Sequence, residues 1–396
     1  MYQNAAILAA VVLVYSAVAG RVGGSWLSGP ILFTVAGVVL GPLVLGYLHL
    51  AVTAADLRTV AELALAMVLF TDAAHADLGV VRRTVGLPRR LLLVGLPLTI
   101  VLGFIAALVI FPGLDPLEAA LIAAMLAPTD AALGAPVVTS KAVPPAIRKA
   151  LNLESGLNDG ICVPVVVILL DFAIGREIEG STLRHILIVA VEEIGLGLLT
   201  GVVLTGLAVA VLRFAARFGW TGEHWRHIPV VALAALCFTA AQVLGSSGFI
   251  ACFTGGLLFG YLRQDQDDDL LAGAASTGEI LALLTWVVFG GPVLGRLLPL
   301  FTWQALLYAV LSLTVIRMLP VVLSLAGTEI SRRDKLFVGW FGPRGLASIV
   351  FAIIVFDAGL PGKETVAATA ACTVLLSVIA HGMTANPLVQ VVGQRA

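Results

Sequence analysis

Long apolar runs, divided by short polar segments, extend along the whole sequence. Only 12% of its 396 residues are charged and 60% are apolar, whereas about a quarter of the residues in a soluble domain are charged. Each run is close to the ~20 apolar residues that a helix needs to cross a bilayer. The sequence therefore predicts an all-α polytopic membrane protein, with residues 1–396 forming a single integral membrane unit.

Charges, glycines and prolines divide the chain into about thirteen candidate transmembrane helices. Their predicted ranges are 4–20, 29–50, 59–76, 91–112, 116–136, 148–172, 184–212, 227–244, 248–262, 277–298, 302–325, 335–356 and 364–389. The first run has no basic segment before it, so we expect a helix there, with a cleaved signal peptide as the alternative.

Lysines and arginines are distributed unequally between the loops of this predicted topology. With the amino terminus outside, sixteen of them fall on the cytoplasmic side and five on the outer side. Short cytoplasmic loops of membrane proteins carry such an excess of positive charge. We therefore expect an outer amino terminus and a cytoplasmic carboxyl terminus, in a prokaryotic plasma (inner) membrane.

The sequence excludes several classes of function. A net charge of −1 offers no basic face for nucleic acid. The four cysteines, Cys162, Cys237, Cys252 and Cys372, lack the C-x-x-C spacing of a zinc or redox site. The sequence has no phosphate-binding loop and neither a G-x-S-x-G nor an H-E-x-x-H hydrolase motif. We therefore expect no enzymatic activity and no cofactor, and any transport must be driven by ion gradients.

Two of the predicted helices contain breaks. Pro128 and Pro136 each remove a backbone donor from the fifth helix, and residues 342–345 (Gly-Pro-Arg-Gly) interrupt the twelfth. These two helices cross the membrane in opposite directions, because they are seven apart in order. Paired interrupted helices in inverted repeats, crossing near the midplane, are typical of secondary transporters. Ordinary proline kinks are the alternative.

Ionisable residues lie within these spans, where a charge costs ~2.5 to 3.5 kcal/mol at the bilayer centre. Asp130 is in the first break. At 1.5 Å per residue, Asp159 lies about 16 Å from the cytoplasmic start of the sixth helix, and Arg344 about 14 Å from that of the twelfth. We expect these charges to converge near the middle of the membrane.

The sixth helix carries two columns of polar residues. Ser155 and Asp159 are four residues apart and share a face, whereas Glu154 and Asn158 form a second column about 100° round the helix. Hydroxyl and carboxylate oxygens suit hard cations, so the first column indicates a cation site. Glu154 is better placed to neutralise Arg344. The alternative is an Asp159–Arg344 pair that only joins helices, which would leave the carboxylate of the first break without a cationic partner.

These motifs together resemble a known family. Thr129-Asp130 in a broken helix, residues 154–160 (Glu-Ser-Gly-Leu-Asn-Asp-Gly) and the later Gly-Pro-Arg-Gly are similar to the monovalent cation:proton antiporter superfamily. The Asn-Asp pair within 154–160 resembles its NhaP-type sodium/proton branch. The similarity covers essentially the whole chain, because the span number, both breaks and all three motifs occur in the family order.

The resemblance implies a role for each matched residue. Asp159 would carry either the cation or a proton. Asp130, Ser155 and Thr129 would coordinate Na+ through carboxylate, hydroxyl and backbone oxygens. Asn158 stands where the electrogenic branch has a second Asp, which implies electroneutral one-for-one exchange.

Two further pairs of residues follow from the resemblance. Glu154 and Arg344 would form a structural ion pair. The family often has an acidic residue in the third helix near the cytoplasmic funnel, and here Asp72 and Glu62 are both candidates for that position.

The resemblance also implies a division of the chain. A transport core of residues 91–172 and 302–389 would move like an elevator against a dimerisation domain of residues 1–76 and 184–298. The partners expected are a monovalent cation, a proton, membrane lipids and a second copy of the chain.

The leading hypothesis is therefore an electroneutral antiporter that exchanges Na+ or Li+ for H+. A K+/H+ antiporter of the same fold is an alternative, because all three alkali cations use the same oxygen ligands. A gated cation channel is an alternative from a different class. The inverted breaks and the carboxylate cluster favour a transporter over a channel.

Overall fold

The computed structural model describes residues 2–22, 28–48, 54–76, 86–130, 132–177, 183–220, 222, 225–263 and 269–393. All regular elements in these ranges are helical, and the same ranges contain no strand. Seven helices of the described part are long and apolar enough to cross a membrane, and five shorter apolar helices of 10–17 residues accompany them. The prediction of an all-α membrane protein is confirmed.

Two compact units make up the chain. The first comprises Met1–Arg58, Thr84–Asn158 and Leu283–Ala396, and the second comprises Thr59–Arg83 and Asp159–Ala282. Three helices contain residues of both units: α3 (Ala54–His75), α9 (Pro145–Glu177) and α13 (Asp269–Val288).

The first unit contains most of the helices. The remaining elements of this unit are α1 (Tyr2–Val22), α2 (Gly29–Leu40), α5 (Leu87–Arg90), a π-helical turn η1 (Leu91–Gly95), α6 (Leu96–Ile110), α7 (Pro116–Met125), α8 (Ala135–Thr139), a π-helical turn η3 (Phe289–Val293), α14 (Leu294–Leu297), a 3₁₀ turn η4 (Leu298–Leu300), α15 (Trp303–Leu313), α16 (Val315–Ser324), α17 (Arg332–Trp340), α18 (Leu346–Asp357) and α19 (Lys363–Gly393).

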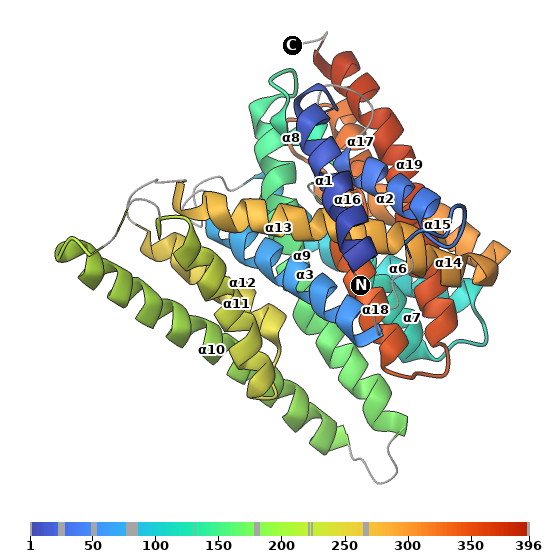
Figure 1. The fold of residues 1–396 in the computed structure, drawn as a ribbon. Helices are drawn as coiled ribbons and strands as arrows, with labels where there is room; N and C mark the ends of the chain where they lie inside the picture. The colour runs from blue at the N-terminus through green and yellow to red at the C-terminus, as the bar shows by residue number, and fades with distance from the viewer. Residues whose placement is uncertain are drawn as a thin grey trace. The chain divides into compact units, whose positions relative to one another are not determined.

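Helix α19 lies along α15 and α18 in this unit (Figure 1). A core of buried apolar side chains includes Phe33 of α2, Trp286 of α13, Phe289 of η3 and Val374 of α19. Phe and Trp side chains each bury about 150–250 Å² of surface. This core therefore joins helices from both ends of the sequence.

In the first unit, two pairs of consecutive helices are each separated by a short non-helical segment. Helix α7 ends at Met125, residues 126–130 are not helical, and α8 begins at Ala135. Helix α17 ends at Trp340, residues 341–345 are not helical, and α18 begins at Leu346. Each non-helical segment contains a proline, which cannot donate the backbone hydrogen bond that would continue the preceding helix.

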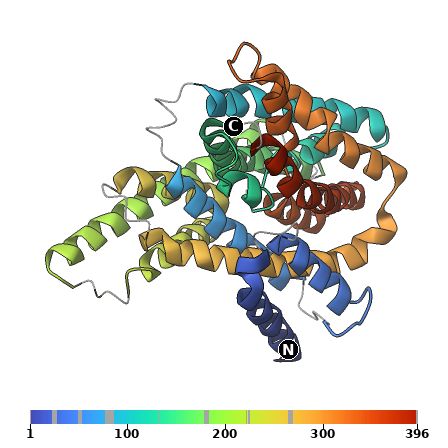
Figure 2. The ribbon, with the colours of Figure 1, turned by 90° about the horizontal axis from the view of Figure 1, so that it is seen from above.

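The second unit is built around α10 (Leu183–Arg217), α11 (Ile228–Val243) and α12 (Gly248–Leu262), which lie side by side in both views (Figures 1 and 2). Glycines face the neighbouring backbones at the closest approaches. A side chain at Gly201 of α10 would meet the carbonyl of Ala251, and one at Gly256 of α12 would meet the carbonyl of Phe70. Small residues allow membrane helices to pack this closely.

The bounds of the two units differ from the predicted functional domains. The predicted core segment 91–172 extends beyond the first unit, which stops at Asn158, and the predicted scaffold segment 1–76 divides between the units at Arg58. The division into compact units shows only which residues pack together. The division into a moving core and a scaffold therefore stays a prediction.

Candidate ion-binding site

Thr129, in the non-helical segment after α7, is bound by two side chains of α9. The Ser155 hydroxyl donates to the Thr129 carbonyl over 2.6 Å, and the Asn158 amide Nδ2 donates to the Thr129 hydroxyl over 2.7 Å. Ser155 and Asn158 are three residues apart, so they lie on neighbouring positions of one helix face. All three side chains are buried. Sequence-predicted residues from two separate spans therefore meet here.

This contact gathers oxygen atoms away from solvent. The amide Oδ1 of Asn158 is buried and accepts no hydrogen bond from the described residues. An amide oxygen has two lone pairs, so it is able to bind a donor or a cation. The carbonyl and hydroxyl of Thr129 and the hydroxyl of Ser155 are oxygens of the same hard chemical type.

Asp159 directly follows Asn158 on α9. Its side chain is buried, with 9% of its surface exposed. Since α9 is one continuous helix, Ser155 and Asp159 share a face, as the sequence predicts. The boundary between the two compact units passes between Asn158 and Asp159.

Asp130 connects the two non-helical segments. Its backbone N–H donates to the carbonyl of Pro343 over 2.8 Å. One carboxylate oxygen accepts from the N–H of Leu346, the first residue of α18, over 2.9 Å, and the other accepts from the N–H of Ala132 over 2.7 Å. An acidic side chain at a helix amino terminus satisfies an unpaired N–H group and interacts favourably with the helix dipole.

Arg344 binds the carboxyl-terminal end of α7. Its guanidinium is completely buried and donates to the carbonyls of Ala127 and Pro128, which follow the end of α7, and to that of Ser312 over 3.4 Å. A cation near a helix carboxyl terminus is favourable for the same electrostatic reason. Asp130, in the segment after α7, thus binds the start of α18. Arg344, in the segment before α18, binds the carbonyls that follow the end of α7.

The predicted ion pair between Glu154 and Arg344 is wrong, because Glu154 pairs with a different arginine. Both carboxylate oxygens of Glu154 are bound by Arg317 of α16, over 2.6 and 2.8 Å. Both side chains are 1% exposed. Such a two-bond geometry uses the fork of the guanidinium fully, whereas the guanidinium of Arg344 lies against backbone carbonyls. The sequence signal for Arg317 was a charged residue within an apolar span.

Two glycines in the Gly-Pro-Arg-Gly segment leave space for these charged groups. A side chain at Gly342 would overlap the guanidinium of Arg317, and one at Gly345 would overlap the carboxylate of Asp130. The segment therefore requires glycine for close approach at both ends.

His381 of α19 is a buried residue that none of the sequence motifs includes. Its Nε2 lies 2.9 Å from the carbonyl of Trp340, so this nitrogen carries a proton and donates. Its Nδ1 lies 3.1 Å from the hydroxyl of Ser377, which accepts from the backbone N–H of Arg344 over 2.7 Å. His381 thereby links both ends of the segment 340–344 to α19. A histidine inside an apolar span was the available signal.

The two predicted funnel acids lie on α3, in the second unit. Glu62 is 7% exposed and Asp72 is partly buried. The contacts around Thr129 described above are made by residues of the first unit. The predicted role of Glu62 and Asp72 stays a prediction.

Comparison with known proteins identifies the family. A family model described as "Sodium/hydrogen exchanger, transmembrane" matches residues 7–391, nearly the whole chain. The chain belongs to this family. The resemblance predicted from the three motifs is confirmed, and the family is one of membrane exchangers rather than of catalytic enzymes.

Several relatives of this chain have names that state the cation they exchange. A "Na(+)/H(+) antiporter" of Schizosaccharomyces pombe is 27% identical over 271 residues, which are 64% of this chain and 56% of that protein. A "K(+)/H(+) antiporter NhaP2" of Shewanella sp. (strain ANA-3) is 28% identical over 274 residues, 67% of this chain and 46% of that protein. This chain thus spans about half the length of these relatives.

A solved structure shares the whole fold. The sodium proton antiporter MjNhaP1 from Methanocaldococcus jannaschii, determined at pH 8, superposes with a TM-score of 0.75 and 19% sequence identity. The match covers 96% of this chain and 99% of that one. At this identity the likeness concerns the arrangement of the helices.

Proposed function

We propose that this chain is a secondary antiporter that exchanges Na+ or Li+ for H+ with a one-for-one stoichiometry. The observation that carries the proposal is the buried set of oxygens around Thr129, which belongs to a chain of the sodium/hydrogen exchanger family. Alkali cations are bound through such carbonyl, hydroxyl and carboxylate oxygens. Broken helices beside this set would supply the remaining backbone oxygens.

Each residue of the set would have its own part in the exchange. Asp159 would hold a proton in one half of the cycle and a cation in the other. Thr129 and Ser155 would coordinate the cation, and the Oδ1 of Asn158 would join them, since no described residue donates to it. Asp130 would contribute through its remaining lone pairs while holding the start of α18.

The neutrality of Asn158 supports electroneutral exchange. With Asp159 as the carboxylate that titrates, a proton replaces one monovalent cation and the net charge moved per cycle is zero. The Glu154–Arg317 pair would be structural, because both oxygens of Glu154 are already occupied by the guanidinium.

Exchange of K+ for H+ is the second candidate. Relatives of similar identity from Shewanella are named K+/H+ antiporters. The same oxygens would bind K+, and only the number and spacing of the ligands would separate the two cations.

The wider arrangement follows from the same proposal. We infer that inverted repeats cross near the midplane and that residues 91–172 and 302–389 move as an elevator against residues 1–76 and 184–298. The protein would be a homodimer in a prokaryotic plasma membrane, with its amino terminus outside. One of the two candidate acids of α3, Glu62 or Asp72, would attract cations toward the cytoplasmic funnel.

Proton flux in proteoliposomes tests the proposal. An imposed pH gradient is followed with an enclosed pH-sensitive dye while NaCl, LiCl, KCl or choline chloride is added. Proton movement coupled to Na+ or Li+, without change of membrane potential, is expected. Asp159→Asn should reduce this flux to that of empty vesicles, because an amide cannot exchange a proton for a cation.

Glu364→Gln is the matched control, since Glu364 is an exposed carboxylate at the start of α19. It should exchange at the wild-type rate. Coupling to K+ alone would select the second candidate. Cation flux that sets up a membrane potential without proton movement would reject antiport and indicate a channel.

A further inference from the structure

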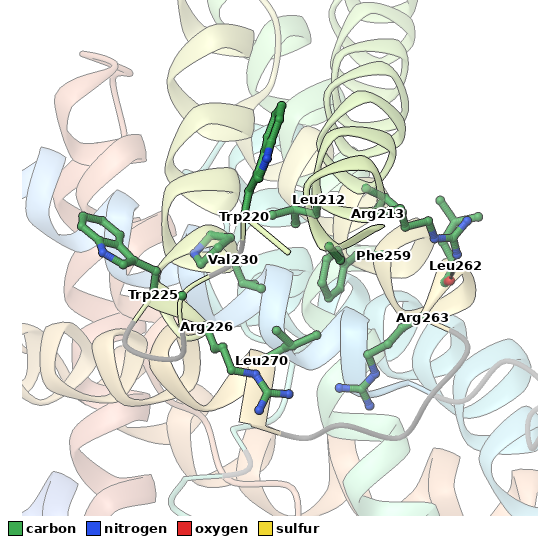
Figure 3. Close-up of a pocket in the computed structure, with 14 residues that line it drawn as sticks. Leu212, Arg213, Trp220, Trp225, Arg226, Val230, Phe259, Leu262, Arg263 and Leu270 are labelled. Atoms are coloured by element: carbon green, nitrogen blue, oxygen red, sulfur yellow. Dashed lines mark hydrogen bonds between the residues drawn. The ribbon is translucent and has the colours of Figure 1, made fainter. Parts of the chain in front are cut away.

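A pocket in the second unit lies where three apolar helices begin or end. It has a volume of about 620 Å³, within the ~300–1,000 Å³ of ligand sites. Its lining includes Arg213 near the end of α10, Arg226 shortly before α11, and Arg263 just after α12 (Figure 3). Among the described residues, none of the fourteen that line the pocket is acidic.

The rest of the lining is aromatic and apolar. Trp220 and Trp225 line the pocket and expose 70% and 66% of their surfaces. Trp220 also packs against Phe214, with ring centroids 5.8 Å apart. Tryptophan is enriched where transmembrane helices reach the boundary between lipid tails and headgroups. Two exposed tryptophans in the lining are therefore typical of a position at the level of the headgroups.

The arginines at this level favour one ligand chemistry. Guanidinium groups bind phosphate in a two-bond geometry and remain charged at all physiological pH values. In Figure 3 the side chains of Arg226 and Arg263 extend toward the same side of the pocket. Arg213 spans from α10 to the carbonyl of Leu262 over 2.5 Å, so it also ties two walls of the pocket together.

The apolar part of the lining suits acyl chains. Val209, Leu212 and Ala216 of α10 line the pocket from the same face of the helix as Arg213. A ligand with a phosphate in the pocket would place apolar tails along these residues. A free phosphate ion would leave this apolar surface without use.

We propose that this pocket binds the phosphate headgroup of an anionic phospholipid, with the acyl chains along α10. The proposal needs neither ion exchange nor a particular orientation of the chain. Basic pockets between transmembrane helices bind such headgroups, at about 1 kcal/mol for each Lys or Arg near the surface, which equals about a fivefold change in affinity. Loss of all three arginines should therefore weaken binding roughly a hundredfold.

Native mass spectrometry of the purified, delipidated protein measures this binding. Dioleoylphosphatidylglycerol is the probe, and dioleoylphosphatidylcholine, with identical chains, is the neutral comparison. The triple variant Arg213→Gln/Arg226→Gln/Arg263→Gln should bind the anionic lipid about a hundredfold more weakly and the neutral lipid unchanged. The double variant Arg226→Gln/Arg263→Gln, which keeps the Arg213–Leu262 bond, should lose about twenty-five-fold.

A matched variant removes three positive charges elsewhere. Arg217→Gln/Arg332→Gln/Arg333→Gln changes exposed arginines outside the pocket lining and should keep wild-type affinity. An equal loss in this control would show that net charge alone attracts the lipid, and would overturn the proposal.

Soluble anions separate the two sources of phosphate. Glycerol 1-phosphate and inorganic phosphate at millimolar concentration should not displace the lipid. Displacement by either would assign the pocket to a soluble anion and overturn the lipid proposal, as would equal binding of both lipids. Because the readout is bound lipid, failure of this proposal is distinguishable from failure of antiport.

Discussion

Arg317 and Glu154 form a two-bond ion pair, over 2.6 and 2.8 Å, between α16 and α9. Each side chain is 1% exposed. Glu154 directly precedes Ser155, whose hydroxyl binds the Thr129 carbonyl. The ion pair therefore fixes α9 at the residue directly before Ser155, which makes one of the candidate ion-binding contacts.

Removing the guanidinium of this pair should destabilise the protein. Arg317→Ala leaves a buried carboxylate without its partner, a loss of roughly 3 to 5 kcal/mol. Thermal unfolding in detergent measures it. Arg332→Ala, at an exposed arginine on α17, should change stability by less than about 0.5 kcal/mol.

A double-variant cycle separates the pair from its surroundings. Glu154→Ala/Arg317→Ala leaves no unpaired charge, so its loss should be smaller than the sum of the two single losses. Additive losses would contradict a direct interaction between the two side chains.

Gly345→Ala should abolish exchange. The added methyl group would overlap the carboxylate of Asp130 and so displace the start of α18 from the segment after α7. Flux in proteoliposomes and the unfolding temperature should both fall. Gly195→Ala on α10 is the control, because nothing lies within 4 Å of the position of its side chain. Equal activity of both variants would refute the required close approach.

Exchange should not respond to membrane potential. With Asn158 neutral, each cycle trades one cation for one proton, so potentials clamped with valinomycin and K+ should leave the initial sodium-driven rates unchanged. Asn158→Asp places a further carboxylate at the side chain that now binds the Thr129 hydroxyl, and any exchange that remains should become sensitive to potential. A severalfold effect of potential on the wild type would contradict electroneutrality.

Protons should compete with sodium. A protonated Asp159 cannot bind Na+, so at pH values where this carboxyl is mostly protonated, the apparent KM should rise about tenfold per pH unit. At higher pH the KM should become constant, and the maximal rate should change much less. Initial rates from about pH 5 to 9, with equal pH on both sides, measure this. A constant KM with a collapsing maximal rate would reject a shared site.

Local patterns in the sequence determined the membrane class, the family and the positions of the two non-helical segments. Apolar runs require lipid as their solvent, because their side chains exceed what a water-soluble core of this size accommodates. Pro128 and Pro343 interrupt helices through a missing backbone donor, which acts within one turn. Thr129, Ser155 and Asn158 were grouped in advance by the family motifs that they match, whereas helix periodicity assigned Ser155 and Asn158 to separate columns of one helix.

The choice of partner for each buried charge was decided by the tertiary structure. Arg317 and Arg344 are both single arginines in apolar spans, and nothing local distinguishes which of them reaches Glu154. The reciprocal roles of Asp130 and Arg344, like the contact of His381 with Trp340, depend on how separate helices are rotated about their axes and shifted along them. Helix rotation and depth result from packing of side chains distant in sequence, and a pairing over 2.6 Å requires both.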